Sequence, residues 1–170
     1  MPDGELQLLL ESVDQLERQQ TELKQAEKTV QRLRGQIKQG REIMVMLAQD
    51  PASQPELLDR LARSRDYDVY TAVVSNPSCP TETLTWFARS RGWSVRYRAL
   101  ARPECPPEIL SELADDPDPK ARHLIASNLS CPPETLSQLL RDTHPDVRQT
   151  ALANPNLPAS VRAMYQLAYG

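Results

Sequence analysis

Three cysteines, two histidines and a run of aspartates are the residues of this chain with the clearest capacity for chemistry. The cysteines could supply thiolates, but Cys79, Cys105 and Cys131 stand 26 residues apart and no CxxC pair occurs. Equivalent positions on packed helices lie roughly 8–10 Å apart, whereas a disulfide needs Cα atoms within about 7 Å. Because Leu157 and Ser53 hold the same place in this spacing, we interpret the cysteines as packing residues.

The histidines and aspartates form no catalytic constellation either. His123 and His144 fall at positions that other copies of the spacing fill with unrelated side chains, and no nucleophile accompanies them. The five glycines form no phosphate-binding loop. Asp115, Asp116 and Asp118 could attract a cation, but such a run is more typical of a helix-capping turn. We therefore predict a protein without catalytic residues, metal or cofactor, and not an enzyme.

The same spacing organises most of the chain. A 26-residue period runs from about Gln49 to the C-terminus, and it aligns Ser-Asn-Pro-Ser-Cys-Pro at 75–80 with similar runs at 101–106, 127–132 and 153–158. A fixed period of this size indicates one supersecondary unit stacked on copies of itself. We expect residues 49–170 to form an all-α, α-solenoid domain of about four and a half repeats, which offers an extended surface rather than a deep pocket.

Each period predicts two helices. In the copy at Cys105, Pro106 and Pro107 can occupy the first turn and leucines follow at helical spacing, so we expect a first helix of about ten residues. Asp118 as N-cap and Pro119 at the next position start a second helix of about two turns, for which both α and partly 3-10 geometry stay open. Stacking must hold such short helices. The expected apolar columns are Leu58, Leu84, Leu110 and Leu136 in the first helices, and Val73, Ala99, Ile125 and Ala151 in the second.

The motifs of the period are Asn-Pro-x-x-Pro, then Glu-x-Leu-x-x-Leu-Ala, then Asp-Pro-x-Val-Arg, with 144–155 as the closest stretch. This pattern resembles the variant leucine-rich repeat over about 120 of the 170 residues. The resemblance implies a right-handed superhelix of alternating α and short α or 3-10 helices without a sheet, related to HEAT-type repeats. Some relatives add a cysteine-rich iron–sulfur module. This chain has no cysteine before Cys79, so that activity is not carried over.

Residues 1–48 have a different pattern. Apolar side chains recur every seven residues at Leu9, Leu16, Leu23, Val30 and Ile37, which is typical of a coiled-coil helix. Two interpretations stay open: the helix caps the first repeat, or it pairs with itself or with another chain. The heptads favour pairing and oligomerisation. The apolar stretch 41–47 suits the capping position in either case, and the glycines at 35 and 40 are expected to loosen this end of the helix.

Aromatic and arginine side chains gather early in the repeats. Six of the eight aromatic residues lie between 67 and 97. Phe87 shares its column with leucines and is assigned to the core, and the column of Arg96, Arg122 and Arg148 is typical of a ladder to neighbouring carboxylates. For the others, a role in binding and a role in structure are both open. The candidates for binding a protein partner are Tyr67, Arg89, Arg91, Trp93 and Tyr97.

Two further features of this region bear on a partner. Tyr67 and Trp93 are equivalent by the period, so they should lie side by side at the start of the second helices. An acidic stretch at 104–118 follows the arginine-rich one. A basic half beside an acidic half would suit an electrostatically oriented protein partner.

The bulk composition fits a scaffold. The net charge is −3 and the pI about 5.5, too little basic excess to imply a nucleic-acid or membrane partner by itself. No apolar run approaches the ~18 residues of a membrane span, and residues 1–5 lack the basic region of a secretory signal, so we expect a cytoplasmic protein. The leading hypothesis is a non-enzymatic protein-interaction scaffold. The alternative is nucleic-acid binding through the arginine and aromatic side chains at 60–102.

Overall fold

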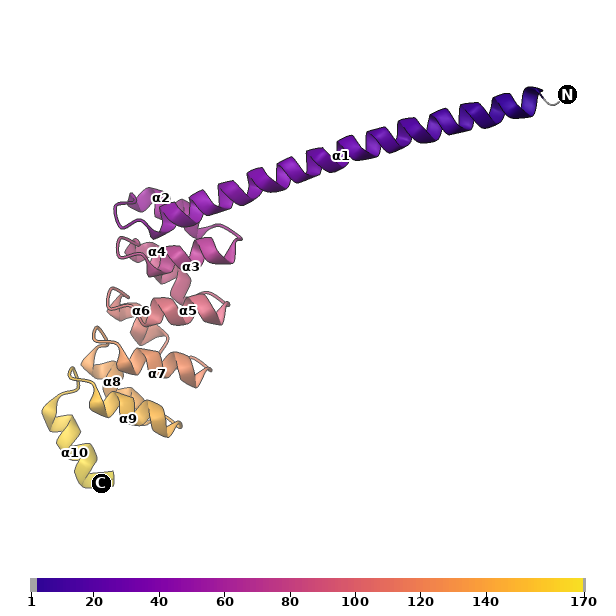
Figure 1. The fold of residues 1–170 in the computed structure, drawn as a ribbon. Helices are drawn as coiled ribbons and strands as arrows, with labels where there is room; N and C mark the ends of the chain where they lie inside the picture. Colours follow the sequence, from indigo (N-terminus) through magenta and orange to yellow (C-terminus); the bar gives the residue numbers. More distant parts are fainter. Residues whose placement is uncertain (1–2, 170) are drawn as a thin grey trace. The chain divides into compact units, whose positions relative to one another are not determined.

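The computed structural model describes the backbone of residues 3–169 and the side chains of residues 11–169. Over that range the chain is all-helical, with 72% of residues in helices, ten helices and no strand (Figure 1). It divides into two compact units, Met1–Met44 and Val45–Gly170, and each is described by itself.

The first unit belongs to one continuous helix, α1 (Asp3–Gln49). Good helix formers fill it and no proline interrupts it. The helix continues through Gly35 and Gly40. The heptad side chains Leu16, Leu23, Val30 and Ile37 are all exposed, from 45% at Val30 to 72% at Ile37. The side chain of Leu9 lies outside the described residues.

The second unit consists of paired short helices and a final helix. The first helices of the pairs are α2 (Pro55–Ala62), α4 (Thr81–Ala88), α6 (Pro107–Glu112) and α8 (Pro133–Leu139). The second helices are α3 (Tyr67–Ser75), α5 (Trp93–Leu100), α7 (Pro119–Ser127) and α9 (Pro145–Ala153), and α10 (Ala159–Tyr169) ends the chain.

The relative lengths of the two helices differ from the prediction. The first helices have six to eight residues rather than about ten, and the second helices have eight or nine, all α-helical. The reason is a tightened last turn, in which a backbone N–H bonds to the carbonyl three residues earlier. Such bonds run from Ser64 to Leu61 and from Ser90 to Phe87, each 3.0 Å long. Bonds of the same kind also end the second helices, as from Asn76 to Val73 (3.0 Å) and from Asn128 to Ile125 (3.1 Å), so a tightened last turn occurs in both helices of a pair.

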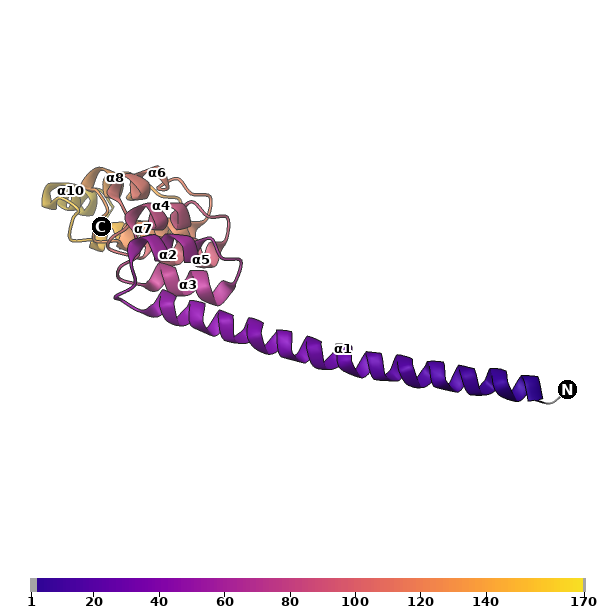
Figure 2. The ribbon, with the colours of Figure 1, turned by 90° about the horizontal axis from the view of Figure 1, so that it is seen from above.

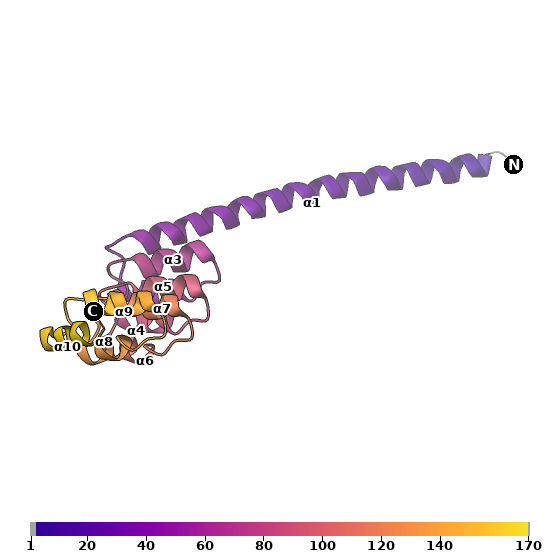
Figure 3. The ribbon, with the colours of Figure 1, turned by 90° about the horizontal axis from the view of Figure 1, so that it is seen from below.

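Successive second helices pack directly on one another. Contacts join α3 to α5, α5 to α7 and α7 to α9, and within the repeats α2 contacts α3, α4 contacts α5 and α8 contacts α9. Figures 2 and 3 show α3, α5 and α7 in one row and α4, α6 and α8 in another. Between the rows runs a continuous core. Both predicted columns are fully buried: Leu58, Leu84, Leu110 and Leu136, and Val73, Ala99, Ile125 and Ala151.

A ladder of side-chain hydrogen bonds also joins the repeats. The Nδ2 group of Asn76 donates to the carbonyl oxygens of Ala48 (2.8 Å) and Asp50 (2.9 Å), which lie one repeat earlier. Asn128 and Asn154 make the same two bonds in later repeats. In the intervening repeat Arg102 takes this role with its Nη1 atom. These bonds satisfy backbone carbonyls that short helices leave without a partner.

The cysteines are packing residues, as predicted. Cys79, Cys105 and Cys131 are buried free thiols, and Leu157 and Ser53 are buried at the same position of the period. Burial raises the thiol pKa to about 11 for Cys79 and Cys105 and to about 12 for Cys131. Neutral thiols of this kind are poor nucleophiles and poor metal ligands.

The last turn of α1 belongs to the second unit and covers the first repeat. Ala48 is fully buried, and Val45 and Leu47 pack against the same core. Ser53 donates a hydrogen bond to the Leu47 carbonyl oxygen at 2.6 Å. The end of the predicted apolar stretch 41–47 thus supplies the neighbour that the first repeat would otherwise lack.

Candidate interaction surface

Tyr67 and Trp93 begin two successive second helices and hold equivalent exposed positions. Tyr67 follows Asp66, whose carboxylate caps α3 by accepting hydrogen bonds from two backbone N–H groups. Trp93 follows Gly92, the N-cap of α5. Both side chains lie outside the core, with 52% of Tyr67 and 67% of Trp93 exposed. Two large aromatic side chains are therefore held at neighbouring helix starts.

A hydrogen bond joins the two helices at this surface. The Tyr67 hydroxyl lies 2.9 Å from the Ser94 hydroxyl, so Tyr67 reaches the residue directly after Trp93. Within each helix a second aromatic ring packs against the first. The ring centres of Tyr67 and Tyr70 are 5.5 Å apart in an edge-on contact, and those of Trp93 and Tyr97 are 5.9 Å apart. These contacts restrict the conformations that the exposed rings can adopt.

Tyr97 is partly buried and forms a contact between two repeats. Its hydroxyl donates to the carboxylate of Asp118, the N-cap of α7. That hydrogen bond, with burial, raises the pKa of Tyr97, and the same bond is the main cause of the lowered pKa of Asp118. Arg96 adds an ion pair with Asp118 at 3.6 Å, and its guanidinium carbon lies 5.9 Å from the centre of the Tyr97 ring. Tyr97 thus links α5 to α7.

Arg89 is also engaged within the molecule. Its Nε atom donates to one carboxylate oxygen of Glu112 at 3.0 Å and its Nη2 atom to the other at 2.6 Å. The hydrogen bonds lower the pKa of Glu112 and raise that of Arg89. Both side chains are about half exposed, so the pair contributes little stability, but it occupies the guanidinium in a two-pronged contact.

Arg91 and Trp86 are the other exposed side chains of this region. Arg91 lies in the turn after α4, and no hydrogen bond or ion pair of the described residues involves it. Trp86 is 55% exposed, and its ring lies 5.1 Å from that of Phe87, which is buried as predicted. Of the five predicted binding residues, Tyr67, Trp93 and Arg91 are therefore exposed to solvent. Arg89 and Tyr97 instead form hydrogen bonds with side chains of the next repeat.

Ion pairs between neighbouring repeats join part of the basic stretch to part of the acidic stretch. Arg89 pairs with Glu112, and Arg96 lies 3.6 Å from both Asp116 and Asp118. These two arginines of the basic stretch therefore face acids of the next repeat. Residues 26 apart lie in adjacent repeats, so opposite charges that are distant in sequence meet along the stack. What stays exposed at the start of α3 and α5 is mainly aromatic.

The predicted arginine ladder is present. Arg122 donates from Nε and Nη2 to the two carboxylate oxygens of Asp142 at 2.6 and 2.9 Å. Arg148 instead donates from Nη1 to the carbonyl oxygens of Asp142 (2.7 Å) and Thr143 (3.1 Å). The column therefore ties helices together at partly buried positions of the stack, and its last member differs.

The histidines take structural positions. The His123 Nδ1 atom lies 3.0 Å from the Thr150 hydroxyl. His144 is the N-cap of α9, and its backbone N–H donates to Asp142 at 2.7 Å. Among the described residues, no three histidine, cysteine or acidic side chains lie together in a way that could hold a metal ion.

Sequence reasoning missed the partners Ser94 and Glu112. A signal for Glu112 exists in the spacing, because Arg89 and Glu112 are 23 residues apart and Asp115 accepts a 2.9 Å hydrogen bond from Gln138 at the same separation. The repeat therefore pairs the same two positions with different complementary side chains. Ser94 has no such signal, since its equivalents are charged residues.

Comparison with known proteins finds no match to this chain among protein-family models, curated proteins or solved structures. Within the described residues, every helix is too short or too polar to cross a lipid bilayer.

Proposed function

We propose that residues 49–170 form a right-handed α-solenoid of the variant leucine-rich repeat type and act as a non-enzymatic scaffold for a protein partner. The row of second helices, the buried columns and the repeated asparagine bonds support a stack in which each unit is stabilised by its neighbours. The observation that carries the functional proposal is the exposed pair Tyr67 and Trp93, fixed at successive helix starts by Ser94, Tyr70 and Tyr97.

The partner is a protein segment with apolar side chains. Tyrosine and tryptophan dominate binding energy at protein interfaces when they are rigid and can be desolvated. The surrounding arginines Arg89 and Arg96 are already paired with acids of the next repeat. An apolar segment can therefore cover the two rings without leaving those charges without a partner.

Nucleic-acid binding is the alternative, and the charge arrangement disfavours it. A nucleic-acid groove needs cations free to replace counterions along the phosphate backbone. Glu112 and Asp118 already neutralise Arg89 and Arg96, so fewer cations are available to a nucleic acid, although Arg60, Arg65, Arg91 and Arg98 are exposed. The aromatic rings suit stacking on bases, so this alternative is included in the test.

The test compares proteins captured by the full chain with those captured by the double variant Tyr67→Ala/Trp93→Ala. Trp86→Ala is the matched control, since it removes an equally exposed ring from a first helix. A partner lost with the double variant and retained with the control supports the proposal; an unchanged set of partners contradicts it. Salt-sensitive retention on single-stranded DNA that Arg89→Glu/Arg91→Glu abolishes would establish the nucleic-acid alternative instead.

The N-terminal helix is proposed to pair with a second copy of itself in antiparallel orientation. Its first half is acidic and its second half basic. Between residues 11 and 22 the charged residues are Glu11, Asp14, Glu17, Glu22 and one arginine, and between 24 and 41 they are Glu27, Lys24, Lys28, Arg32, Arg34, Lys38 and Arg41. An antiparallel arrangement sets each half against the opposite charge, whereas a parallel one sets like charges together.

The positions flanking the heptad residues support the same orientation. With Leu23 in the interface, a parallel dimer would bring Glu22 of one helix against Glu27 of the other, which is repulsive. An antiparallel dimer centred between Lys24 and Gln25 avoids this contact. It also sets the large side chain of Leu23 opposite the small Ala26, which lets the two helices approach closely.

A further inference from the structure

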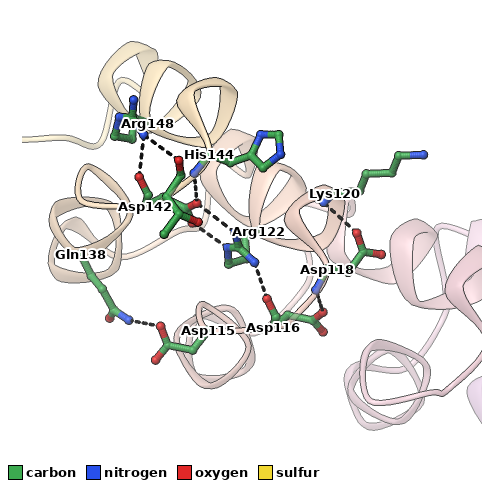
Figure 4. Close-up of polar contacts among 10 residues, drawn as sticks. Asp115, Asp116, Asp118, Lys120, Arg122, Gln138, Asp142, His144 and Arg148 are labelled. Atoms are coloured by element: carbon green, nitrogen blue, oxygen red, sulfur yellow. Dashed lines mark hydrogen bonds and ion pairs between the residues drawn. The ribbon is translucent and has the colours of Figure 1, made fainter.

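A groove between two successive repeats contains the most completely paired arginine of the stack. It encloses about 620 Å³ and is lined by residues of the α6–α7 and α8–α9 pairs, including Arg122, Leu139 and Asp142. Figure 4 shows Arg122 between Asp116 and Asp142. Its Nη1 atom donates to the Asp116 carbonyl oxygen at 2.6 Å, and its other two donors hold the Asp142 carboxylate.

The same groove recurs one repeat later, beside the last helix. It encloses about 900 Å³, and seven of its lining residues are those of the first groove moved by 26 positions. They are Leu140, Arg141, Arg148, Met164, Tyr165, Ala168 and Tyr169. By the 26-residue period Arg148 corresponds to Arg122 and Ala168 to Asp142, although Asp142 lies in the turn after α8 whereas Ala168 lies within α10. The arginine is retained and the carboxylate is gone.

Arg148 is held in the same way as its equivalent. Its Nη1 atom donates to the Asp142 carbonyl oxygen at 2.7 Å, just as that of Arg122 donates to the Asp116 carbonyl oxygen (Figure 4). No hydrogen bond or ion pair of the described residues uses its Nε or Nη2 atom. Those are the two atoms with which Arg122 grips a carboxylate. The Arg148 guanidinium can therefore donate two parallel hydrogen bonds, from Nε and Nη2, to a carboxylate.

We infer that the groove between α9 and α10 is a binding site for a carboxylate, in which an aspartate or glutamate side chain of a protein partner takes the place that Asp142 has beside Arg122. The site combines this charged contact with apolar surface from Met164, which is 71% exposed, and from Tyr165. The partner segment therefore carries an apolar residue close to its acidic one.

A second copy of this chain does not fit the site in register. In the first repeat the position equivalent to Asp142 is Ser64, which has no charge to offer Arg148. A phosphate group could also bind an arginine edge. A carboxylate is favoured because two earlier repeats carry an aspartate, Asp116 and Asp142, at the position that corresponds to Ala168. The site lies apart from the Tyr67 and Trp93 surface, so failure of either proposal leaves the other standing.

The direct test follows the Arg148 side-chain Nε–H signal by NMR in the full chain. The probe is a capped peptide of residues 140–144, which carries Asp142, and the control probe has asparagine instead. We expect a saturable shift with the aspartate peptide and binding at least tenfold weaker with the asparagine peptide. Arg148→Gln should weaken binding of the aspartate peptide equally, while Arg98→Gln, at an exposed arginine of α5, should leave it unchanged.

A second test needs no ligand. Ala168→Asp places a carboxylate among the residues that line the groove, so it should raise the melting temperature by about 2–4 °C and abolish binding of the aspartate peptide. Ala168→Asn is the matched control without the charge, and in an Arg148→Gln background Ala168→Asp should give no gain. If Ala168→Asp changes neither stability nor peptide binding, the inference is wrong. Tighter binding of inorganic phosphate than of the aspartate peptide would overturn it in favour of a phosphate site.

Discussion

The side-chain amide of Asn128 donates to the carbonyl oxygen of Leu100 at 2.7 Å, across a separation of 28 residues. The acceptor belongs to the end of the second helix one repeat earlier, and Asn128 is itself buried. A single amide thus satisfies a buried helix terminus that belongs to a different unit. The same relationship links Asn76 to Ala48 and Asn154 to Ala126.

Asn128→Ala is expected to lower the free energy of unfolding by about 1–3 kcal/mol, because it leaves buried carbonyl oxygens without a donor. The measurement is urea denaturation followed by circular dichroism. Ser130→Ala is the control, since it removes an exposed inter-repeat bond to the Pro103 carbonyl oxygen and should change stability by less than about 0.5 kcal/mol. Equal effects of the two variants would refute a special role for the asparagine column.

Leu110→Ala should destabilise the chain by about 2–5 kcal/mol, since it opens a cavity in a fully buried column between neighbouring repeats. Leu129→Ala changes a leucine that is 62% exposed, and its effect should stay within about 0.5 kcal/mol. Thermal unfolding of both variants distinguishes these values. A small loss at Leu110 would mean that the repeats do not share one core.

The Arg122–Asp142 pair is expected to make stability depend on acid pH. The hydrogen bond from Arg122 lowers the pKa of Asp142 in the folded chain, so its stabilisation is present above the ordinary carboxyl pKa and is lost as the pH falls. Asp142→Asn should cost about 1.5–3 kcal/mol at pH 7 and progressively less below pH 4. Denaturation curves of both proteins at several pH values test this; a pH-independent difference would contradict it.

The buried thiols should be unreactive until the chain unfolds. Their pKa of about 11 to 12 in the folded state leaves them protonated at pH 8, and burial blocks reagents. Because the folded pKa lies above the ordinary value of about 9, the stabilisation is present below pH 9 and is lost as the pH rises towards 11. Iodoacetamide labelling with and without urea measures the protection. Rapid labelling of Cys105 in the native chain would be inconsistent with this packing.

Sequence periodicity was sufficient to predict the helices, their buried columns and the role of the cysteines, because those depend on spacing and polarity alone. It did not predict which charges meet. Arg89 reaches Glu112 and Arg96 reaches Asp118 only because consecutive repeats bring positions about 20 residues apart into contact. Helix lengths were also mispredicted, since the choice between α and 3-10 bonds in the last turn depends on backbone geometry rather than on residue type. The lack of a carboxylate at Ala168, the residue that corresponds to Asp142, was recognised only by comparing the side chains that line the two grooves.

Pairing of the N-terminal helices should be antiparallel, and spin labels distinguish the orientations. In a dimer centred between Lys24 and Gln25, two labels at Gln25→Cys lie close together, whereas two labels at Asp14→Cys are separated by about 21 residues, or roughly 30 Å at 1.5 Å per residue. A parallel dimer would bring both pairs close.

The native cysteines do not compete for the label because they are buried. Leu16→Ser/Leu23→Ser should shift the chain to monomer in sedimentation, since both exposed leucines belong to the heptad positions. Thr21→Ser, which leaves the heptad residues intact, is the control. Short label distances at both sites would refute the antiparallel orientation, and a monomer at all concentrations would refute self-pairing altogether.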